Sequence, residues 1–504
     1  MAVDWSRDEG TVAVIGTGAM GRGIAQVAAQ GGLKVLLFDA AAGAAEKARA
    51  YIAEMLDGAA KKGRLAPAEA EAAVARIRVV GALEDLAPAD AVIEAIVEAL
   101  DAKRDLFRKL EAVLRPDTVI ASNTSSIRIA SIAAACTGKA RIAGMHFFNP
   151  VPLMKLVEVI RAPATAPAVV DALTALGKRM GRVPVTVSDS PGFLVNLGNR
   201  PFSTEAVRLA MEGVASPAEV DAILRDAVGF RMGPFELMDL TGLDVNFPAA
   251  KIMYEGYFHD RRLATWPLHQ AMAESGQLGR KTGGGWYTYD AEGKLVPQPT
   301  DAPTDAAPAP TLVLAERDEA LSKLLLEAGA ELLARDDGVS PIVGAPLGED
   351  ASTYASRLGL AARRLVCVDL SGNIAKRITA MRAPGADPAA VAAVIARLAQ
   401  TGAKVTLIKD SPGFVVQRVV AMIGNLGCEM AQIGIASPAD IDLAMKLGLN
   451  YPRGSLEMVD FLGGARRVHE ILGRIQAVTG DDRYRPSLWL RRRALLDLPV
   501  HTPD

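Results

Sequence analysis

Two parts of the chain repeat each other at a constant spacing. The segment Asp189–Phe193 (DSPGF) recurs as Asp410–Phe414, 221 positions later, and Ala215–Ala218 (ASPA) recurs as Ala436–Ala439 at the same spacing. The spacing holds without a gap from about residue 161 to residue 242. This regularity indicates a duplicated domain. A chain of 504 residues has room for roughly three domains in all.

A glycine-rich turn stands between an apolar strand and a helix near the N-terminus. The strand is expected over Thr11–Ile15, the turn is Gly16–Gly21 (GTGAMG), and a helical pattern starts at once after it. A second strand, Leu33–Phe38, ends at Asp39. Because glycines allow a tight turn and a close approach of backbone to pyrophosphate, this context predicts a Rossmann unit that binds a dinucleotide. A glycine turn without a ligand is the alternative.

Asp39 favours NAD over NADP. Its carboxylate can accept hydrogen bonds from the ribose hydroxyls of NAD and would repel the 2′-phosphate of NADP. The residues that follow, Ala40–Ala42, include no arginine that could hold this phosphate. The predicted cofactor is therefore NAD.

Helical and strand patterns alternate after Asp39. Helices are expected over residues 41–62 and 101–114, and strands near residues 77–80, 91–95 and 118–121. This alternation predicts a mostly parallel sheet with right-handed crossovers. Ligands of such sheets bind beyond the carboxyl ends of the strands. Three polar groups follow strand ends in this region: Glu98, Ser122–Ser126 and His146.

His146 and Glu158 are expected to form a pair. His146 follows an apolar run, residues 141–145, that is typical of a buried strand, and two prolines then prevent a helix. In the next strand, residues 156–160, Glu158 shares a face with apolar residues. A buried carboxylate needs a partner, and a carboxylate that holds an imidazole is the usual arrangement of a general base. These residues alone leave open a core histidine beside an unrelated surface glutamate.

Composition argues against several classes of function. The formal net charge is −2 and no basic stripe or tail is present, so we expect no nucleic-acid partner. No apolar run reaches about 18 residues, and Met1–Gly10 does not resemble a signal peptide, so we expect no membrane partner. The three scattered cysteines predict neither a disulfide framework nor a metal site, and they favour a reducing, cytoplasmic setting.

The second half lacks the residues that catalysis would need. A proline-rich segment, Gly293–Pro310, reads as a linker. About 95 residues, Leu312–Thr406, then stand where a whole Rossmann domain stood in the first half, and they contain no GxGxxG motif. At the 221-residue spacing the counterparts of His146, Glu158 and Asn196 are Cys367, Thr379 and Gln417. We expect Cys367 to be a small buried hydrophobe and the second copy to be non-catalytic.

Seven motifs in the first half resemble the 3-hydroxyacyl-CoA dehydrogenase family, in the order and at the spacing of that family. They are GTGAMG (16–21), EAIVE (94–98), SNTSS (122–126), HFFNPVPLMKLVEVI (146–160), DSPGFLVN (189–196), GPFELMDLTGLD (233–244) and LGRKTGGGWY (278–287). The resemblance implies an α/β Rossmann domain followed by an all-α domain that dimerises. A degenerate Rossmann remnant and a second all-α copy are then expected. The expected bounds are 1–187 (Rossmann), 188–290 (helical), 291–311 (linker), 312–407 (remnant) and 408–504 (second helical copy).

The resemblance also implies roles for individual residues. It makes His146 the catalytic base, Glu158 its orienting partner, and Ser125 and Asn196 the groups that hydrogen-bond the substrate oxygen. Leu197 stands where the family commonly has arginine. Lys62 matches a lysine near the phosphates of coenzyme A, although an exposed lysine pair at 61–62 is otherwise ordinary. The positions that match NAD contacts are Gly16, Gly18, Ala19, Met20, Gly21, Asp39, Glu98, Lys103, Asn149 and Lys281.

By resemblance, the expected reaction is the oxidation of a 3-hydroxyacyl-CoA, in the family usually the S alcohol, to a 3-ketoacyl-CoA by NAD. Short linear and dicarboxylic acyl groups such as 3-hydroxyadipyl are both open, and the long two-copy form favours phenylacetate catabolism over general fatty-acid β-oxidation. We expect the second helical copy to pack on the first, so that the protein is a monomer with an internal pseudo-dimer or a homo-oligomer. The alternatives are a dehydrogenase of a free hydroxy or sugar acid and an inactive dinucleotide-binding protein.

Overall fold

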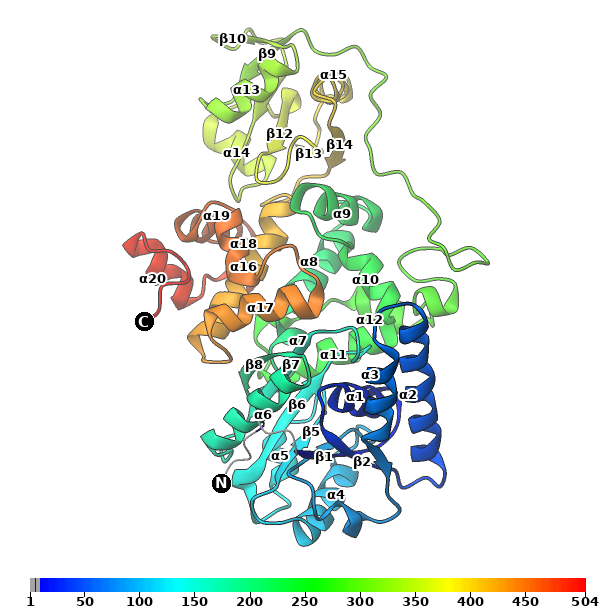
Figure 1. Ribbon diagram of the computed structural model, residues 1–504. Helices are drawn as coiled ribbons and strands as arrows, with labels where there is room; N and C mark the ends of the chain where they lie inside the picture. The colour runs from blue at the N-terminus through cyan, green and yellow to red at the C-terminus, as the bar shows by residue number, and fades with distance from the viewer. Residues whose placement is uncertain (1–4, 6–9) are drawn as a thin grey trace. The chain divides into compact units, whose positions relative to one another are not determined.

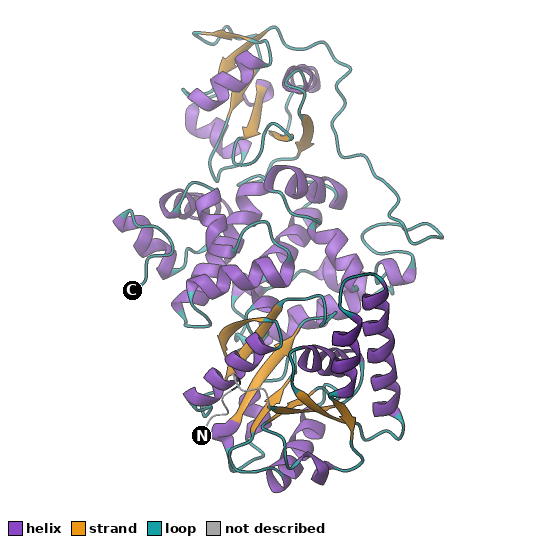
Figure 2. Ribbon diagram, in the orientation of Figure 1, coloured by secondary structure: helices purple, strands orange, loops and turns teal. Residues whose placement is uncertain are grey.

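The computed structural model describes Trp5 and residues 10–504, and the chain divides into two compact units (Figures 1 and 2). The first unit contains residues up to 197 together with residues 434–449, and the second contains residues 198–433 and 450–504. The chain therefore leaves the first unit at residue 197 and returns to it for one segment of the second sequence copy.

The first unit is built on an eight-stranded sheet with the strand order β3-β2-β1-β4-β5-β6-β7-β8. Its strands are β1 (Thr11–Ile15), β2 (Lys34–Phe38), β3 (Ile77–Val79), β4 (Ala91–Glu94), β5 (Val119–Ser122), β6 (Ile142–Phe147), β7 (Leu156–Arg161) and β8 (Val183–Ser188). Neighbouring strands are parallel except for β6 and β7, which are antiparallel. Strands β4 and β6 are buried along their whole length and β1 along all but its first residue, as their continuous apolar runs predict.

Helices connect these strands and cover the sheet (Figure 2). They are α1 (Ala19–Gln30), α2 (Ala44–Lys61), α3 (Pro67–Ala75), α4 (Leu100–Val113), α5 (Ile129–Ala133) and α6 (Pro167–Arg179). One continuous hydrophobic core joins α1, α2, α3 and α6 to the strands. The helix predicted over residues 41–62 corresponds to α2, which begins three residues later, after the left-handed Gly43. The short helix α7 (Val195–Gly198) begins at the end of this unit.

The second sequence copy contributes the last helix of the first unit, α17 (Pro438–Leu449). The backbone N–H of Ser188 at the end of β8 donates to the carbonyl oxygen of Ile435 at 2.8 Å. Gly448 of α17 lies so close to β7 that a Cβ atom there would stand 2.9 Å from Leu156 and 3.0 Å from Val195. The second copy therefore packs directly on the strand that contains Glu158.

The second unit contains a smaller, six-stranded mixed sheet with the order β10-β9-β11-β12-β13-β14. Its strands are β9 (Thr311–Leu314), β10 (Glu331–Leu333), β11 (Ile342–Gly344), β12 (Leu365–Asp369), β13 (Arg377–Arg382) and β14 (Lys404–Ile408), and its helices are α13 (Glu319–Glu327), α14 (Ala351–Leu358) and α15 (Pro388–Ala399). Again one pair is antiparallel, β12 with β13. The predicted fold class, a Rossmann domain with a helical domain, a Rossmann-like remnant and a second helical copy, is confirmed.

The pairing of β12 with β13 corrects one sequence assignment. Thr379 lies opposite Asp369 in the second sheet, as Glu158 lies opposite His146 in the first. The residue at the position of His146 is therefore Asp369, and the expectation that Cys367 occupies it is wrong. The connection between the paired residues is two residues shorter in the second copy, so the constant spacing fails before β13. Cys367 is fully buried, and burial raises the pKa of its thiol well above the ordinary value.

The rest of the second unit is helical. The first copy contributes α8 (Arg200–Met211), α9 (Pro217–Ile223), α10 (Pro234–Thr241), α11 (Leu243–Gly256) and α12 (Pro267–Glu274). The second copy contributes α16 (Val416–Gln432), α18 (Ser455–Phe461), α19 (Ala465–Thr479) and α20 (Leu488–Leu496). Helices α8 and α16 pack against each other. In the described part of the chain no helix combines the length and hydropathy needed to cross a membrane.

The contact between α17 and the first sheet has a counterpart in the second unit. The backbone N–H of Lys409, at the end of β14, donates to the carbonyl oxygen of Val214 at 3.0 Å. Both partners of this bond lie 221 positions from those of the Ser188–Ile435 bond. The π-helical turn Leu224–Val228, which follows α9, also contacts β13, where Arg377 pairs with Asp226 at 2.9 Å. Each sequence copy thus packs part of its helical domain on the sheet of the other copy.

Two glycine-to-alanine substitutions test the contact between α17 and β7. Alanine favours a helix over glycine by about 1 kcal/mol, so Gly473→Ala in α19, where a Cβ atom meets nothing within 4 Å, should raise the urea midpoint of unfolding. Gly448→Ala should lower it, because the overpacking at Leu156 and Val195 costs about 1–3 kcal/mol. Equal gains from both substitutions would contradict the close packing of α17 on β7.

Candidate active site

His146 and Glu158 lie directly opposite each other on the antiparallel strands β6 and β7. Nδ1 of His146 is 2.6 Å from Oε2 of Glu158. The exposed fractions of the two residues are 6% and 1%, so Glu158 is not a surface glutamate. A carboxylate on Nδ1 sets which ring nitrogen carries the proton. The arrangement leaves Nε2 as the nitrogen that can exchange a proton with a ligand.

The second oxygen of Glu158 holds the start of α7. Oε1 accepts hydrogen bonds from the backbone N–H groups of Leu194 at 3.1 Å and Val195 at 2.9 Å. The next residue, Asn196, has its side-chain nitrogen 3.5 Å from the carbonyl oxygen of Ser125. One buried carboxylate therefore positions the imidazole and the segment that contains Asn196. The four residues assigned to catalysis from sequence meet in the first unit: His146, Glu158, Ser125 and Asn196.

Glu98 organises the serine-rich loop that contains Ser125. Its Oε1 accepts hydrogen bonds from the hydroxyl of Thr124 at 2.6 Å, from the backbone N–H of Ser125 at 3.0 Å and from both donors of Ser126. Burial acts to raise the pKa of Glu98, but the bond from Thr124 and the charge of Lys103 hold the pKa below its ordinary value. An ionised Glu98 thus fixes the loop, whereas the sequence assigned this residue to cofactor contact alone.

A buried cluster behind this loop was not found from the sequence. Glu94, the last residue of β4, is fully buried and pairs with the ammonium of Lys103 at 2.6 Å. It also accepts the hydroxyl of Ser122, which lies opposite it on β5, at 2.6 Å. Lys103, with a side chain only 1% exposed, reaches Glu98 as well at 3.3 Å. The sequence offered one sign of this cluster, which is that Glu94 ends the apolar strand Ala91–Glu94. A buried carboxylate requires a cation or several hydrogen-bond donors nearby.

The glycine-rich turn and Asp39 lie together at the N-terminus of α1. Asp39 accepts the N–H and the hydroxyl of Thr17 at 2.8 and 2.7 Å, and the N–H of Ala41 at 2.9 Å. Burial acts to raise the pKa of Asp39, but these bonds hold it below its ordinary value. A fixed negative charge at this position disfavours a ligand with a phosphate on the ribose 2′ position.

The glycines fit the close approach of a dinucleotide. A Cβ atom at Gly16, which has a φ of +87°, would lie 2.6 Å from the carbonyl oxygen of Ala95, and one at Gly21 would overlap the backbone of Gly16. A Cβ atom at Gly18, the N-cap of α1, would meet no described atom within 4 Å. The turn is therefore closed on the protein side and open beside the helix N-terminus, where a pyrophosphate binds in such folds.

A groove of about 520 Å³ lies between α1, α2 and residues 149–153. Three cations line it, Arg22, Lys62 and Arg64, and Asn149 lies at its wall. The guanidinium of Arg22 stacks on the ring of Tyr51 at 3.9 Å. The lining also contains two polar residues, Gln26 and Gln30, and an apolar wall of Met55, Leu65, Pro150, Val151, Pro152 and Leu153. The structure thus places Lys62 in a groove that combines positive charge with an apolar wall.

Lys281 belongs to the second unit, unlike the other residues assigned to NAD contact. Its ammonium pairs there with Asp244 at 2.5 Å. Among the residues that the structure describes, no cluster of His, Cys, Asp and Glu could hold a metal ion. The three cysteines are buried, and none of them forms a disulfide bond among the described residues.

Family models match most of the chain. The NAD-binding domain of 3-hydroxyacyl-CoA dehydrogenase matches residues 11–190. The C-terminal domain of 3-hydroxyacyl-CoA dehydrogenase matches twice, over residues 192–289 and 413–498. The second match lies where the repeat predicts a second helical copy.

Known proteins resemble the chain over its whole length or over its first half. The 3-hydroxyadipyl-CoA dehydrogenase of Escherichia coli is 40% identical over 97% of this chain and 98% of its own length. The human mitochondrial hydroxyacyl-coenzyme A dehydrogenase is 41% identical over 55% of this chain and 90% of its own. A crystal structure of 3-hydroxybutyryl-CoA dehydrogenase from Escherichia coli K12 covers 97% of this chain and 98% of its own, with 38% identity and a TM-score of 0.82.

The carboxylate of Asp39 can be tested by cofactor binding. We expect Asp39→Ala to raise the dissociation constant of NADH roughly tenfold or more, because charge-assisted hydrogen bonds are worth about 1.5–3 kcal/mol. NADPH should bind as before or better, since the repulsion of its 2′-phosphate is removed. Titration of NADH and NADPH fluorescence measures both constants, with Asp57→Ala on the exposed face of α2 as the control. Unchanged NADH binding would contradict the role of Asp39.

Proposed function

Because the chain belongs to the 3-hydroxyacyl-CoA dehydrogenase family and contains its NAD-binding domain, we propose that it oxidises a 3-hydroxyacyl-CoA to a 3-ketoacyl-CoA with His146 as the general base. The observation that carries this proposal is the buried contact of 2.6 Å between Nδ1 of His146 and Glu158. The same residues support the reverse reduction. The family and the NAD cofactor that the motifs predicted are both confirmed by the matches.

The residues act on the substrate through proton transfer and positioning. NAD, when bound, supplies the acceptor for the hydride. Nε2 of His146 takes the proton of the 3-hydroxyl group, and Glu158 stabilises the imidazolium that forms. The hydroxyl of Ser125 and the amide of Asn196 donate to the substrate oxygen as it becomes a carbonyl. Glu98 and Glu158 hold these two donors in place through backbone contacts.

The groove beside α2 fits the coenzyme A part of the substrate. Coenzyme A joins phosphate groups to a long pantetheine arm, and phosphates attract clustered cations. Lys62, Arg22 and Arg64 supply the cations, and the apolar wall suits the arm. Asn149 connects this groove to β6, which contains His146. The charge and shape of the groove favour a CoA thioester over a free hydroxy acid.

The acyl group is proposed to be short or dicarboxylic. The 3-hydroxyadipyl-CoA dehydrogenase of Escherichia coli aligns with this chain over 98% of the relative's length. The solved structure of a 3-hydroxybutyryl-CoA dehydrogenase aligns over the same share of its own chain. Both match nearly the whole length of this chain, so both 3-hydroxyadipyl-CoA and 3-hydroxybutyryl-CoA are candidate substrates. A comparison of kcat/KM for 3-hydroxyadipyl-CoA and 3-hydroxybutyryl-CoA distinguishes the two.

The base is tested by His146→Ala. General base catalysis typically contributes about 10²–10⁴-fold, so kcat for NADH oxidation with acetoacetyl-CoA should fall by at least 100-fold while NADH still binds. His259→Ala, at an exposed histidine of the second unit, is the matched control and should retain the activity. NADPH in place of NADH and free acetoacetate in place of the thioester should both be poor substrates. Near-normal turnover by His146→Ala, or a preference for the free acid, would refute the proposal.

The groove is tested separately with Lys62→Ala. Loss of one charge-assisted contact to phosphate, worth about 1.5–3 kcal/mol, should raise KM for acetoacetyl-CoA roughly tenfold with little change in kcat. Acetoacetyl-N-acetylcysteamine lacks the phosphates, so its KM should be unaffected. Lys61→Ala is the control, because Lys61 pairs with Asp57 on the exposed surface of α2. Equal effects on both thioesters would assign Lys62 a merely structural role.

A further inference from the structure

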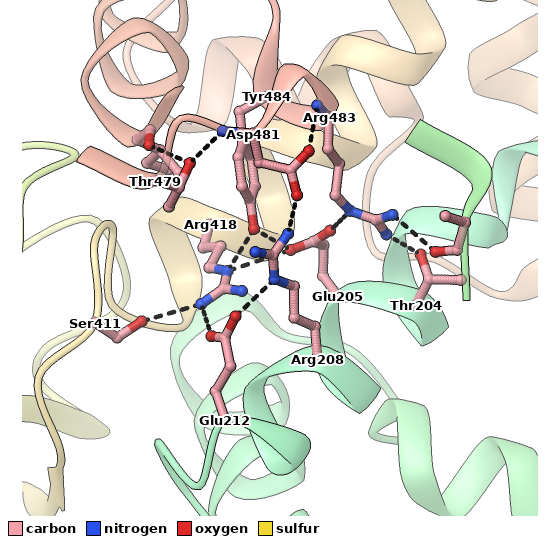
Figure 3. Close-up of polar contacts among 12 residues, drawn as sticks. Thr204, Glu205, Arg208, Glu212, Ser411, Arg418, Thr479, Asp481, Arg483 and Tyr484 are labelled. Carbon is pink, nitrogen blue, oxygen red and sulfur yellow. Dashed lines mark hydrogen bonds and ion pairs between the residues drawn. The ribbon is translucent and has the colours of Figure 1, made fainter. Parts of the chain in front are cut away.

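A fully buried charge cluster lies where the two helical copies meet within the second unit. Figure 3 shows Glu205 of α8 between Arg418 of α16 and Arg483, with the hydroxyl of Tyr484 beside them. Oε2 of Glu205 lies 3.2 Å from Nε of Arg418 and accepts a hydrogen bond from the Tyr484 hydroxyl at 2.9 Å. Oε1 of Glu205 pairs with Arg483. The side chains of Glu205, Arg418 and Arg483 are at most 1% exposed.

Further ion pairs surround this cluster. Glu212, which follows the last residue of α8, binds Arg418 at 2.8 Å. Arg208 contacts both Glu212 at 2.6 Å and Asp481 at 2.8 Å (Figure 3). Burial acts to raise the pKa of Glu205, but the charges of Arg483 and Arg418 hold it below its ordinary value. Glu205 is therefore an anion that depends on cations from the second sequence copy.

The cluster has no equivalent at the mirrored position between the copies. At the 221-residue spacing the counterparts of Glu205, Arg418 and Tyr484 are Leu426, Leu197 and Leu263. Of the central residues only Arg483 has a charged counterpart, Arg262, which pairs with Glu429 at 2.8 Å and with Asp260 at 3.1 Å. The buried carboxylate, Glu205, thus belongs to the first sequence copy, and the arginine that pairs with it, Arg418, belongs to the second.

This asymmetry makes each helical copy a poor partner for itself. Two first copies would place leucine where Arg418 and Tyr484 now meet Glu205, so the carboxylate would lose one of its two arginines and its hydroxyl donor. Two second copies would place Leu426 against both buried arginines with no carboxylate between them. A buried charge that loses its partner is strongly destabilising, and specific interfaces use such mismatches to reject wrong partners.

We propose that the buried face of α8 is an interaction surface that accepts the second helical copy and rejects another first copy. The partner it fits is defined by an arginine at the position of Arg418 and a hydroxyl at that of Tyr484. The face is thereby reserved for pairing between unlike copies, and two chains do not dimerise through it as first copy on first copy.

The experiment uses the full chain, cut after it has folded. A protease site placed in residues 291–296, which lie outside the helices and strands of the structure, separates the chain into a first and a second fragment. Nicked protein with and without isotope label is mixed and held in mild urea until the label has scrambled between complexes. Native mass spectrometry then counts the pairs. We expect pairs of unlike fragments to exceed either homodimer by at least tenfold.

Substitutions then change the preference in a defined direction. Glu205→Leu removes the anion and should raise the ratio of first-fragment homodimers to unlike pairs at least tenfold. Arg418→Leu, in the other fragment, should shift the ratio the same way and provides a second test if Glu205→Leu does not fold. Glu255→Gln, a control on α11 outside the cluster with a side chain 55% exposed, should leave the ratio near that of the original protein. Abundant homodimers of the unmodified first fragment, or a ratio that neither leucine variant changes, would overturn the proposal.

Discussion

The antiparallel pairing of β6 with β7 is the constraint on which the candidate site depends. It interrupts a parallel sheet at one place and sets His146 directly opposite Glu158. Because successive side chains of a strand point to opposite faces, a shift by one residue would separate the two groups. The same carboxylate also binds the backbone at Leu194 and Val195, so the position of Asn196 follows from this register. One pair of strands thus positions both the proposed base, His146, and the segment that contains Asn196.

The second copy retains this strand pairing without its chemistry. There Asp369 lies opposite Thr379, and the side-chain amide of Gln417 donates to Asp369 at 3.0 Å. None of these three residues is a histidine, and the residue opposite the buried Asp369 is a threonine instead of a glutamate. Burial raises the pKa of Asp369 above its ordinary value. Oδ1 of Asp369 accepts the bond from Gln417, while Oδ2 is buried and has no hydrogen-bond partner among the described residues.

Features set by local sequence could be predicted, and those set by packing between distant segments could not. The periods of the strands, the turn at Gly16–Gly21 and a glutamate among apolar residues at 158 were enough to predict the turn and the pairing of Glu158 with His146. The cluster of Glu94 with Lys103 requires β4 and β5 to pair in register and α4 to place Lys103 beside them. No local sequence pattern predicts this arrangement. A constant spacing also misassigned Cys367, since a connection shortened by two residues changes which residues face each other while leaving both strands recognisable.

The exchange of helical segments between the copies gives the second copy a structural role at the candidate site. Helix α17 comes from the second copy, yet it packs on β7 so closely that Gly448 has no room for a Cβ atom beside Leu156 and Val195. Leu156 begins the strand that contains Glu158, and Val195 donates its N–H to that carboxylate. The geometry of the proposed site in the first copy therefore depends on α17 from the second copy. The second sheet, which follows no glycine-rich turn of the GxGxxG type, thus belongs to the same sequence copy as the helix that packs on β7.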